Sequence, residues 1–375
     1  MIRRLELKNY RGFKEYTVGN LARVNLLVGK NNSGKTSILE AVELLTDGGD
    51  VRALDRLARR RGETALPPPD LTRTTSTLLA DVSHFFHGHS ISPGARFSLK
   101  SNDQEELTWE ILSPGALPEN PSGDPEGYMS TDDLVISVDG TRPWETEDVR
   151  RGPSLAYVSE AGALNLRRSI PSYVRFARSK SDEAPPTVVV PQASLAPAIL
   201  GLMWDGIVKD GKDDEVVEAM RILDDQLTSI VFLSSLGATA NDAGGGILVG
   251  RQGEAKRQPL GSQGEGMRRL LVLAIALTRA KGGVLLIDEV DTGLHYSILG
   301  DVWLLIVETA LRLDIQVFLT THSLDCLRAL GWLCGARPDL AAEVSVQKIE
   351  RGLDEAVALN AGRIQIAVEQ DIEVR

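Results

Sequence analysis

Cysteine is nearly absent from this chain, whose 375 residues include only Cys326 and Cys334. Two cysteines give neither a metal-ligand pattern nor a disulfide framework, which is typical of a protein in a reducing cytoplasm. Long apolar runs are missing too, since the longest, such as Leu270–Leu277, are far too short to span a bilayer. The first residues lack the apolar core of a signal peptide. We therefore expect a cytoplasmic protein with no membrane partner.

An excess of positive charge is also missing. The chain has 52 acidic and 41 basic residues and a formal net charge of −11, which argues against a general nucleic-acid coat. Clusters at Arg59–Arg61, Arg150–Arg151 and Arg167–Arg168 leave a local basic groove open, although scattered arginines on a solvated surface give the same pattern. The first cluster lies in residues 50–75, a basic and then proline-rich segment that we expect to be a surface loop.

The segment Gly29–Thr36, GKNNSGKT, fits the pattern G-x-x-x-x-G-K-[ST] at every position. Its glycines let backbone N–H groups converge on phosphate oxygens, Lys35 supplies a positive charge, and Thr36 offers a hydroxyl to Mg²⁺. A glycine-rich turn with an incidental lysine is the alternative, but an apolar strand and an amphipathic helix flank the loop as a phosphate site requires. The expected nucleotide-binding residues are Gly29, Asn31, Asn32, Ser33, Gly34, Lys35, Thr36 and Ser37.

Two acidic residues follow an apolar strand late in the chain. Val284–Ile287 is typical of a strand buried on both faces, and Asp288 and Glu289 come directly after it. Such a pair suits metal-assisted attack of water on a phosphate, with Asp288 holding Mg²⁺ and Glu289 acting as general base. Alone, the pair would favour an exposed strand cap, but beside a phosphate loop it favours catalysis. The long interval from Thr36 to Asp288 predicts an inserted region.

A serine/glycine turn precedes the helix that leads to this acidic strand. Ser262, Gln263, Gly264 and Glu265 fit a capping box, with serine at the N-cap and glutamate three residues later. One interpretation is a well-capped helix and nothing more. The other is that Ser262 and the N–H of Gly264 face a γ-phosphate at the positive end of the helix. The position of the turn just before the acidic strand favours the second.

Of the five histidines, His322 has the clearest functional setting. It follows the apolar segment 315–319, where a histidine can hydrogen-bond a γ-phosphate and sense its loss, although a polar residue in a turn is the alternative. His295 falls in the turn after the acidic pair. The other three lie together in HFFHGH at 84–89, but no carboxylate or cysteine completes a ligand set there. A packed or exposed loop is therefore favoured over a metal site.

The overall pattern predicts an α/β fold with a mixed or parallel core sheet. Three segments read as strands of a second, antiparallel sheet, at 94–101, 106–112 and 133–139. Hydrophobic residues make up 42% of the chain, enough for a sizeable core. We expect one head over 1–375, divided into a phosphate-loop lobe with the antiparallel sheet at 1–160, a mainly helical insertion at 161–235, and a lobe with the serine/glycine turn, acidic strand and His322 at 236–375.

Together these segments resemble an ABC-type ATPase head, which is a P-loop NTPase, and more narrowly its OLD, RecF and SMC branch. The matching pieces are LELKNYRGFKE, GKNNSGKTS, LGSQGEGMRRLL, VLLIDEVDTGLH and TTHSLDCLRAL. They occur in the order that the family shows and lie toward both ends of the chain. The serine/glycine turn reads SQGE, not SGGQ, and no long coiled-coil arm is present. A full SMC or double-strand-break repair protein is therefore not expected.

The resemblance implies that ATP and Mg²⁺ are sandwiched between the two heads of a homodimer, with a higher oligomer left open. Each head offers its phosphate loop, its acidic pair and His322 as a switch histidine. Residues 262–265 of the other head reach the γ-phosphate. Arg11, in NYRGF, matches a nucleotide-proximal arginine of this branch, and Gln192 is the best match for its metal-proximal glutamine.

Three functions stay open. The 53 residues after His322 contain no D-x-D pair, so we expect the nuclease domain of OLD proteins to be missing and any nuclease or toxin activity to lie on a separate effector protein. The first function is an ATPase that switches such an effector in phage defence, of a retron or OLD kind. The second is a RecF-like DNA repair ATPase that clamps DNA, and the third is an ATP-locked scaffold with slow turnover.

Overall fold

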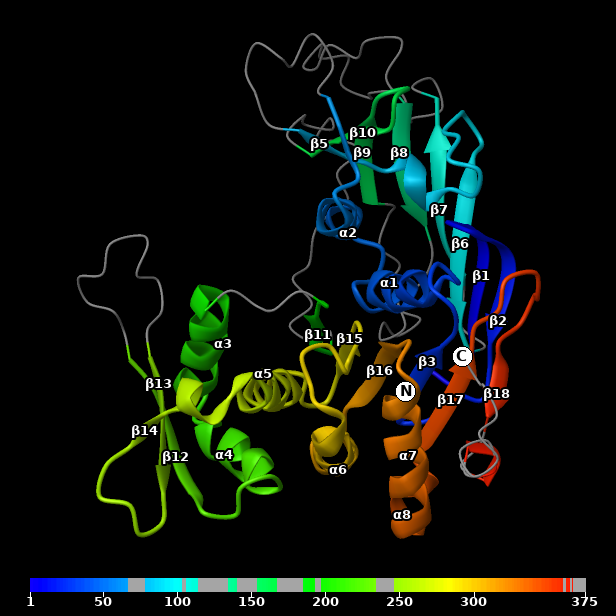
Figure 1. The fold of residues 1–375 in the computed structure, drawn as a ribbon. Helices are drawn as coiled ribbons and strands as arrows, with labels where there is room; N and C mark the ends of the chain where they lie inside the picture. The colour runs from blue at the N-terminus through cyan, green and yellow to red at the C-terminus, as the bar shows by residue number, and fades with distance from the viewer. Residues whose placement is uncertain are drawn as a thin grey trace, which may run out of the picture.

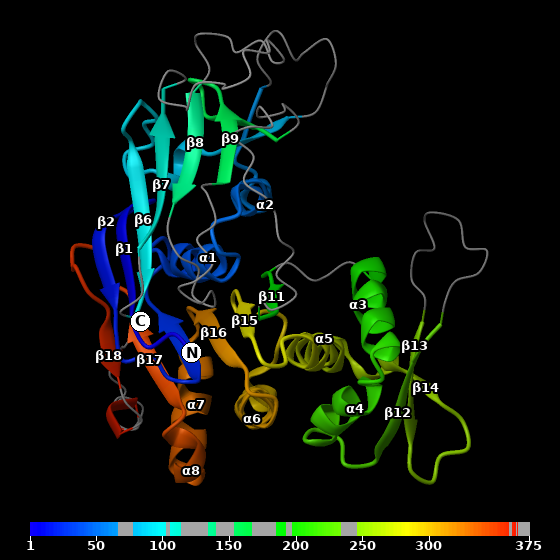
Figure 2. The same cartoon turned by 180° about the vertical axis from the view of Figure 1, so that it is seen from behind.

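The computed structural model describes residues 1–66, 78–102, 106–113, 134–139, 154–166, 185–192, 197–233, 246–359, 362–364 and 366. A central sheet is covered by helices on one face and by a helix and a second large sheet on the other (Figure 1, Figure 2). No helix among these residues is long and apolar enough to cross a membrane. Both cysteines are free and buried.

The central sheet has six strands in the order β11-β15-β16-β3-β17-β18, and its first five strands are parallel. Parallel strands covered on both faces need apolar side chains on both faces, and alternate residues here enter two different cores. Leu26 and Ile287 face one core, while Leu27 and Leu286 face the other. The strands are β3 (Val24–Val28), β11 (Thr187–Val190), β15 (Val284–Ile287), β16 (Gln316–Thr321), β17 (Val344–Lys348) and β18 (Val357–Leu359).

A nine-stranded antiparallel sheet forms a second layer, in the order β2-β1-β6-β7-β8-β9-β10-β5-β4. Helix α1 (Lys35–Thr46) lies between the two sheets, and Ile38 and Val42 share a core with the stacked rings of Phe97 and Trp109 (Figure 1). The expected antiparallel strands are confirmed as β6 to β8. The strands are β1 (Leu5–Tyr10), β2 (Phe13–Val18), β4 (Thr64–Ala65), β5 (Leu79–Asp81), β6 (Arg96–Ser101), β7 (Leu107–Leu112), β8 (Leu134–Asp139), β9 (Ser154–Val158) and β10 (Ala163–Asn165).

Helices cover the other face of the central sheet. They are α5 (Glu265–Arg279), α6 (Leu299–Arg312) and α7 (Leu324–Ala336), followed by the short α8 (Pro338–Ala341). Their apolar residues enter the same core as Leu26 and Ile287, and α7 begins where Ser323 accepts a hydrogen bond from the backbone N–H of Cys326. This packing fixes the carboxyl ends of β15 and β16 next to each other.

A smaller unit extends beyond β11 and carries α3 (Pro197–Lys209), α4 (Asp213–Arg221) and a three-stranded sheet. The sheet consists of β12 (Leu227–Phe232), β13 (Ile247–Arg251) and β14 (Gln258–Pro259). Trp204 stacks on Phe232 with ring centroids 4.8 Å apart, and the buried residues of α4 continue into the core formed by α5. The unit therefore shares its core with the central layers.

The segments 50–75 and 161–235 hold elements that we did not expect. Residues 51–61 form helix α2 (Val51–Arg61) and not a loop, because Asp50 caps the helix and Leu54 and Leu57 are buried. The insertion expected at 161–235 holds α3 and α4, but it also supplies β10 to the antiparallel sheet and β11 to the parallel sheet. The division of the chain into three lobes stays a prediction.

Candidate functional site

Four strand ends meet at one edge of the central sheet. Because β11, β15, β16 and β3 are parallel neighbours, the residues that follow each strand emerge side by side. These residues are Gln192 after β11, the acidic pair after β15, His322 after β16, and the phosphate loop after β3. The structure thus brings Thr36 and Asp288, which are 252 residues apart in the sequence, within hydrogen-bond distance.

The phosphate loop has the backbone conformation that its glycines allow. Gly29 and Gly34 have φ values of 150° and 105°, and Asn32 has a φ of 62°. A Cβ at Gly29 would lie 2.5 Å from the carbonyl oxygen of Ile349, and one at Gly34 would collide with the ring of Phe13. Side chains are therefore excluded at both glycines, which leaves the backbone N–H groups open to a phosphate.

The polar side chains of the loop divide into exposed and buried groups. Asn31 and Asn32 are exposed, whereas Ser33 is buried and its hydroxyl has no hydrogen-bond partner among the described residues. Ser37 is also buried, and its hydroxyl accepts a hydrogen bond from Arg61 at 3.3 Å. The side chain of Ser37 is thus engaged with α2, and a contact between this residue and a nucleotide would come from its backbone.

Lys35 folds back over the loop. Its Nζ donates to the carbonyl oxygens of Gly29 at 2.8 Å and Lys30 at 3.1 Å. Burial lowers the pKa of this amine, and the nearby carboxylates of Glu289 and Asp288 oppose that change. A lysine bound only to carbonyl oxygens can exchange these partners for an anion, so its position fits a phosphate ligand.

The acidic pair is held by hydroxyl groups and a histidine. Thr36 donates to Asp288 Oδ1 at 3.2 Å, and Thr320 donates to the same oxygen at 2.6 Å. His322 Nδ1 lies 2.7 Å from Glu289 Oε2, and the Glu289 side chain is 13% exposed. Glu289 has a φ of 50°, a left-handed conformation that is unusual for a residue other than glycine. Strained backbone of this kind clusters at functional sites.

A divalent cation fits the oxygens at this edge. The hydroxyl of Thr36 and the carboxylate of Asp288 are the hard oxygen donors that Mg²⁺ prefers, and they already lie within hydrogen-bond distance. No group of three or more His, Cys, Asp or Glu residues suited to a metal occurs in the described part of the chain. Mg²⁺ that is bound mainly by a nucleotide needs only one or two protein ligands, so Thr36 and Asp288 would suffice.

Gln192 lies at the same edge. It is exposed and follows β11 by two residues, and the carbonyl oxygen of Val190 accepts a hydrogen bond from the backbone N–H of Asp288 at 3.0 Å. The glutamine is thus on the strand next to the acidic pair. Its role as a metal-proximal ligand stays a prediction.

The structure does not support the nucleotide contact expected of Arg11. This side chain is only 6% exposed, and it forms ion pairs with Glu40 and Glu63, both at 2.8 Å. Its guanidinium also lies over the ring of Phe85, 4.4 Å from the centroid. Because two carboxylates and an aromatic ring already surround it, Arg11 joins α1 to the chain after α2 and does not face a phosphate.

Phe13, two residues after Arg11, is the member of this segment that touches the phosphate loop, and we did not predict it. Its ring lies where a side chain on Gly34 would be, and it packs on Tyr16 with centroids 4.6 Å apart. The second aromatic residue of NYRGF, close to the arginine, is the sequence signal that could have identified this contact. The N-terminal hairpin therefore supports the loop through a ring and not through a charge.

The serine/glycine turn differs from the expected capping box. Ser262 lies in a short 3-10 helix, η4 (Leu260–Gln263), where its hydroxyl donates to the carbonyl oxygen of Pro259 at 2.7 Å. The residue that caps α5 is Gly264, with φ 92° and ψ 162°, and no side chain caps the helix. The capping-box prediction is therefore wrong, because the 3-10 turn displaces the serine from the helix end. Ser262 and Gly264 are exposed, and Glu265 begins the helix.

The remaining charged candidates have partners of their own. The rings of His84 and His89 are 4.9 Å apart, His84 lies 3.6 Å from Asp81, and His87 contacts the carbonyl oxygen of Arg11 at 2.9 Å; the described residues hold no group of three or more His, Cys, Asp or Glu suited to a metal. In the first basic cluster, each arginine pairs with an acid: Arg59 with Asp55, Arg60 with Glu43 and Arg61 with Glu40. The other two basic clusters, residues 150–151 and 167–168, lie outside the described residues.

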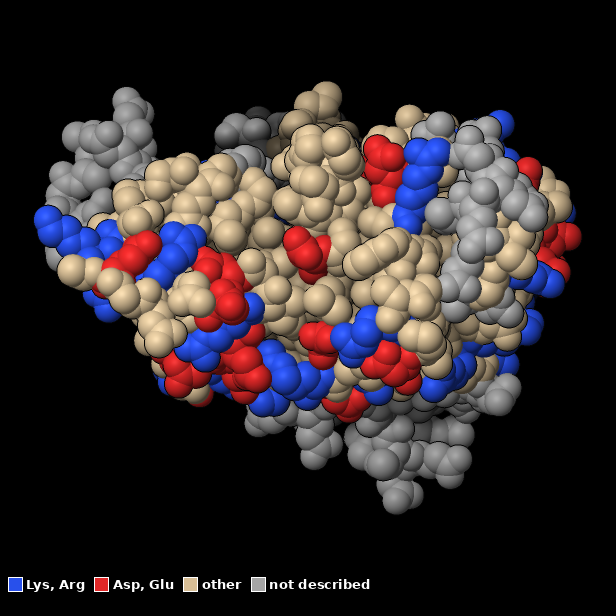
Figure 3. Space-filling model, turned by 60° about the horizontal axis from the view of Figure 1, so that its bottom comes forward, with Lys and Arg blue, Asp and Glu red and all other residues tan. Residues whose placement is uncertain are grey.

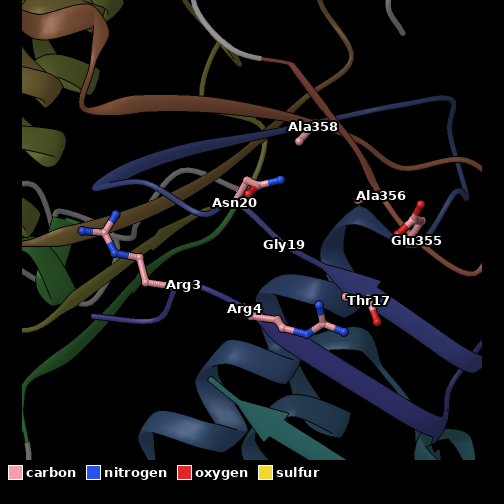
Figure 4. A pocket seen from close by; sticks show the side chains of 8 residues that line it. All are labelled: Arg3, Arg4, Thr17, Gly19, Asn20, Glu355, Ala356 and Ala358. Atoms are coloured by element: carbon pink, nitrogen blue, oxygen red, sulfur yellow. The ribbon is translucent and has the colours of Figure 1, made fainter. Parts of the chain in front are cut away.

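Two hollows lie at the amino end of the central strands, opposite the phosphate loop. One has a volume of about 310 Å³ and is bordered by Arg3, Arg4 and Glu355 (Figure 4). The other, about 660 Å³, lies beside the start of β17 and shares Arg3 with the first. Arg4 pairs with Glu6 at 2.7 Å. Neither hollow contains an expected site residue, so the chemistry is assigned to the other edge.

A protein-family model described as "AAA domain, putative AbiEii toxin, Type IV TA system" matches residues 24–327. The chain belongs to this AAA-domain family. The match begins at the strand before the phosphate loop and ends after His322, so it includes most of the residues at the sheet edge. The expectation of an ATPase domain is thereby confirmed, and this family is a coarser assignment than the OLD branch.

Curated relatives match over short stretches. The DNA replication and repair protein RecF of Bifidobacterium longum subsp. infantis is 37% identical over 82 residues, which is 22% of this chain and 18% of the relative. An uncharacterized protein of Methanocaldococcus jannaschii is 48% identical over 44 residues, 12% of this chain and 20% of the relative. The chain thus spans about a fifth of the length of these relatives.

Among solved structures, SMC heads are similar over nearly the whole chain. The SMC head domain from Thermotoga maritima has a TM-score of 0.40 and 14% identity, covering 96% of this chain and 98% of that one. The Smc head with an extended coiled coil bound to the C-terminal domain of ScpA, from Pyrococcus furiosus, has a TM-score of 0.43 and 13% identity, covering 99% of both chains.

Proposed function

We propose that this AAA-domain protein hydrolyses ATP with Mg²⁺ and closes around ATP as a homodimer. The observation that carries the proposal is the meeting of Thr36 with Asp288, 3.2 Å apart, beside Glu289 in hydrogen-bond contact with His322. A phosphate loop, a metal-binding carboxylate and a general base are the parts that phosphoryl transfer to water requires. The membership in an AAA-domain family supports the same activity.

Glu289 is the general base in this proposal. Its carboxylate orients a water molecule and takes a proton as the water oxygen bonds to the γ-phosphorus; the bond to the bridging oxygen breaks and ADP leaves with the electron pair. Lys35 and the loop N–H groups stabilise the phosphate charge. Mg²⁺ would neutralise further charge when held by Thr36 and Asp288. The γ-phosphate gives His322 a second acceptor, which releases Glu289 for the water.

A second copy supplies the serine/glycine turn. In the described residues, no hydrogen bond or ion pair joins residues 262–264 to the phosphate loop, while Ser262 and Gly264 are exposed at the start of α5. A turn with free N–H groups at a helix start suits an anion. We therefore assign Ser262, Gln263, Gly264 and Glu265 to the γ-phosphate bound by the partner head.

The biological output that we propose is control of a separate effector protein, a nuclease or toxin, in defence against phage. The family description names a putative toxin and a type IV TA system, which supports a role in a two-component toxic system. Figure 3 shows basic and acidic side chains mixed over one face. Lysines and arginines of the structure also pair with acidic residues, as in Lys281–Glu215 and Arg312–Glu218. A face of paired charges binds DNA weakly, so this face does not favour a DNA clamp.

A RecF-like DNA repair ATPase is the second candidate, favoured by the 37% identity to RecF over 82 residues. Salt-dependent binding of the purified protein to bare duplex DNA would support it. Co-purification with a neighbouring gene product at a defined mass would support the effector model instead. ATP retained for many hours without phosphate release would point to the third candidate, an ATP-locked scaffold.

Substitution Glu289→Gln tests the core of the proposal. The variant should bind Mg²⁺ and ATP, lose roughly 100-fold or more of its ATPase rate, as expected for loss of a general base, and accumulate as an ATP-bound dimer. Phosphate release and light scattering give the two readouts. A normal rate in this variant would refute the assignment of Glu289.

The double variant Glu289→Gln with Ser262→Arg tests whether Ser262 is needed for dimer formation but not for ATP binding. The arginine should block the partner's approach, so the protein should still bind ATP but remain monomeric. An ATP-bound dimer of the double variant would contradict the role of Ser262 in trans. Loss of ATP binding by the monomer would instead assign Ser262 a structural role within its own head.

A further inference from the structure

The end of β16 contacts the acidic loop through three consecutive residues. Thr320 donates to Asp288, Thr321 donates to Asp291, and His322 bonds to Glu289. These three residues, the last two of β16 and the one after it, therefore each bind a different acid that follows β15. Neighbouring parallel strands are joined by backbone hydrogen bonds. The three side-chain hydrogen bonds form a second set of contacts, located where the strands end.

Thr320 differs from its two neighbours because it holds two residues at once. Its hydroxyl donates to Asp288 Oδ1 at 2.6 Å and accepts from the backbone N–H of Glu289 at 2.8 Å. Its carbonyl oxygen accepts from the N–H of Val290 at 3.0 Å. The residue is fully buried, with no exposed surface, so no water can replace the hydroxyl.

The two bonds of Thr320 fall on the two features that the site needs. The bond to Asp288 engages its Oδ1 oxygen. The bond from the N–H of Glu289 holds the peptide group that precedes this residue, whose backbone is in the left-handed conformation. A glutamate in this region relaxes toward ordinary φ values unless its surroundings hold it. The second oxygen of Asp288 receives only a long contact from Thr36, at 3.5 Å, which leaves it available to a cation.

We propose that Thr320 is a positioning residue for the proposed ATPase reaction. Its hydroxyl orients the Asp288 carboxylate toward Mg²⁺ and keeps Glu289 in the conformation that aims its side chain at the attacking water. Thr320 touches neither nucleotide nor metal and acts only through Asp288 and Glu289. This inference rests on the proposed function, and the experiment below includes a readout that does not.

Substitution Thr320→Val removes the hydroxyl and keeps the shape. We expect kcat to fall and the Mg²⁺ concentration at half-saturation to rise, each by about 10- to 100-fold, as is typical when a partner of a metal ligand is lost. Binding of ATP without Mg²⁺ should stay within about 2-fold of the wild type, because the phosphate loop is untouched. Thr320→Ser should restore both values to within about 3-fold, because its hydroxyl makes the same bonds.

Thr309→Val is the matched control. Thr309 on α6 is also fully buried, and its hydroxyl has no hydrogen-bond partner among the described residues. This variant should have wild-type kcat and wild-type Mg²⁺ dependence. Thr320→Val with unchanged Mg²⁺ dependence would overturn the proposal, and so would a Thr320→Ser variant as impaired as Thr320→Val, since that result would assign the effect to packing.

Hydrogen exchange in nucleotide-free protein separates this inference from the proposed function. A peptide that spans residues 284–292 reports the N–H of Glu289, which Thr320 binds. We expect Thr320→Val to exchange faster than the wild type there, and Thr320→Ser and Thr309→Val to match the wild type. Equal protection in Thr320→Val would overturn the positioning role. A wild-type protein that neither binds nor hydrolyses ATP would refute the proposed function instead.

Discussion

Two groups of charges flank the phosphate loop and its helix α1, and they are balanced in opposite ways. In the first, Arg11 and Arg61 surround Glu40 at 2.8 and 2.5 Å, and Arg11 also pairs with Glu63. We call these four residues the arginine network. In the second, the acidic pair has hydroxyl groups and a histidine around it, and Lys35 is turned toward carbonyl oxygens.

This difference separates charges that hold the structure from charges that await a ligand. Burial raises the pKa of Glu40, and Arg11 and Arg61 counter that cost by pairing with it. No ion pair joins an arginine to the acidic pair in the described part of the chain, so we expect a cation and the phosphate loop to balance its charge. Removing a charge should therefore destabilise the arginine network and leave the folded acidic pair nearly as stable as before.

The largest expected effect is on the arginine network. Substitution Arg11→Met leaves Glu40, which is 3% exposed, with Arg61 alone and leaves Glu63 without its arginine, and it should lower the free energy of unfolding by about 3–5 kcal/mol, as for a broken buried ion pair. Urea unfolding measures the change. The control is Arg52→Met, at an exposed pair with Asp50 that should contribute less than about 1 kcal/mol.

A double substitution sharpens this result. Adding Glu40→Met to Arg11→Met removes the buried carboxylate that has lost one of its two arginines, and Arg61, whose side chain is 31% exposed, can then turn to water; part of the lost stability should be recovered. A stability of Arg11→Met equal to that of the wild type would show that Arg11 is free in solution. In that case the residue would again be available for the nucleotide contact that we expected from the sequence.

Local patterns predicted the carboxyl edge of the sheet well. Each motif there combines an apolar strand with a short polar segment, so parallel strand order alone brings Thr36 to Asp288 and His322 to Glu289. The antiparallel strands followed from residue alternation in the same way. These features depend on neighbours in the sequence and on one simple rule of sheet assembly.

The errors occurred where a residue's role depends on distant partners or on exact backbone angles. Arg11 was assigned by resemblance, but its partner Glu63 lies 52 residues away, beyond a helix that we took for a loop. The apolar spacing of Val51, Leu54 and Ala58 was a helical signal within that charged segment. At the serine/glycine turn, a capping box and a 3-10 turn have the same sequence pattern, and only the angles of Gly264 distinguish them.

Asp47 is an intermediate case, with two arginine and two acidic neighbours. Burial raises its pKa to about 6; Arg56 and, less strongly, Arg60 oppose the rise, while Glu43 and Asp50 add to it. Because the folded pKa lies above the ordinary value of 3.8, this group stabilises the fold below pH 4, and that contribution is lost as the pH rises through 6.

Between pH 4 and pH 7.5, the wild type should therefore lose about 1–2 kcal/mol relative to Asp47→Asn, which cannot ionise. Urea unfolding at the two pH values measures the difference. Arg56→Met should enlarge the loss in the wild-type background, because it removes the stronger of the two arginines that oppose the shift. If the free energies of unfolding of the wild type and Asp47→Asn differed by the same amount at both pH values, Asp47 would be solvated. Its pair with Arg56 would then be an ordinary exposed ion pair.

The smallest expected change in stability is at the acidic pair itself. Asparagine tolerates the left-handed φ of 50° better than glutamate and carries no charge beside Asp288, so Glu289→Asn should leave the free energy of unfolding unchanged or raise it by up to about 1 kcal/mol. Its ATPase activity should nevertheless be lost. Urea unfolding and phosphate release on the same preparation give both values. A loss of stability near that of Arg11→Met would show that the acidic pair also holds the fold, and the contrast between the two groups of charges would fail.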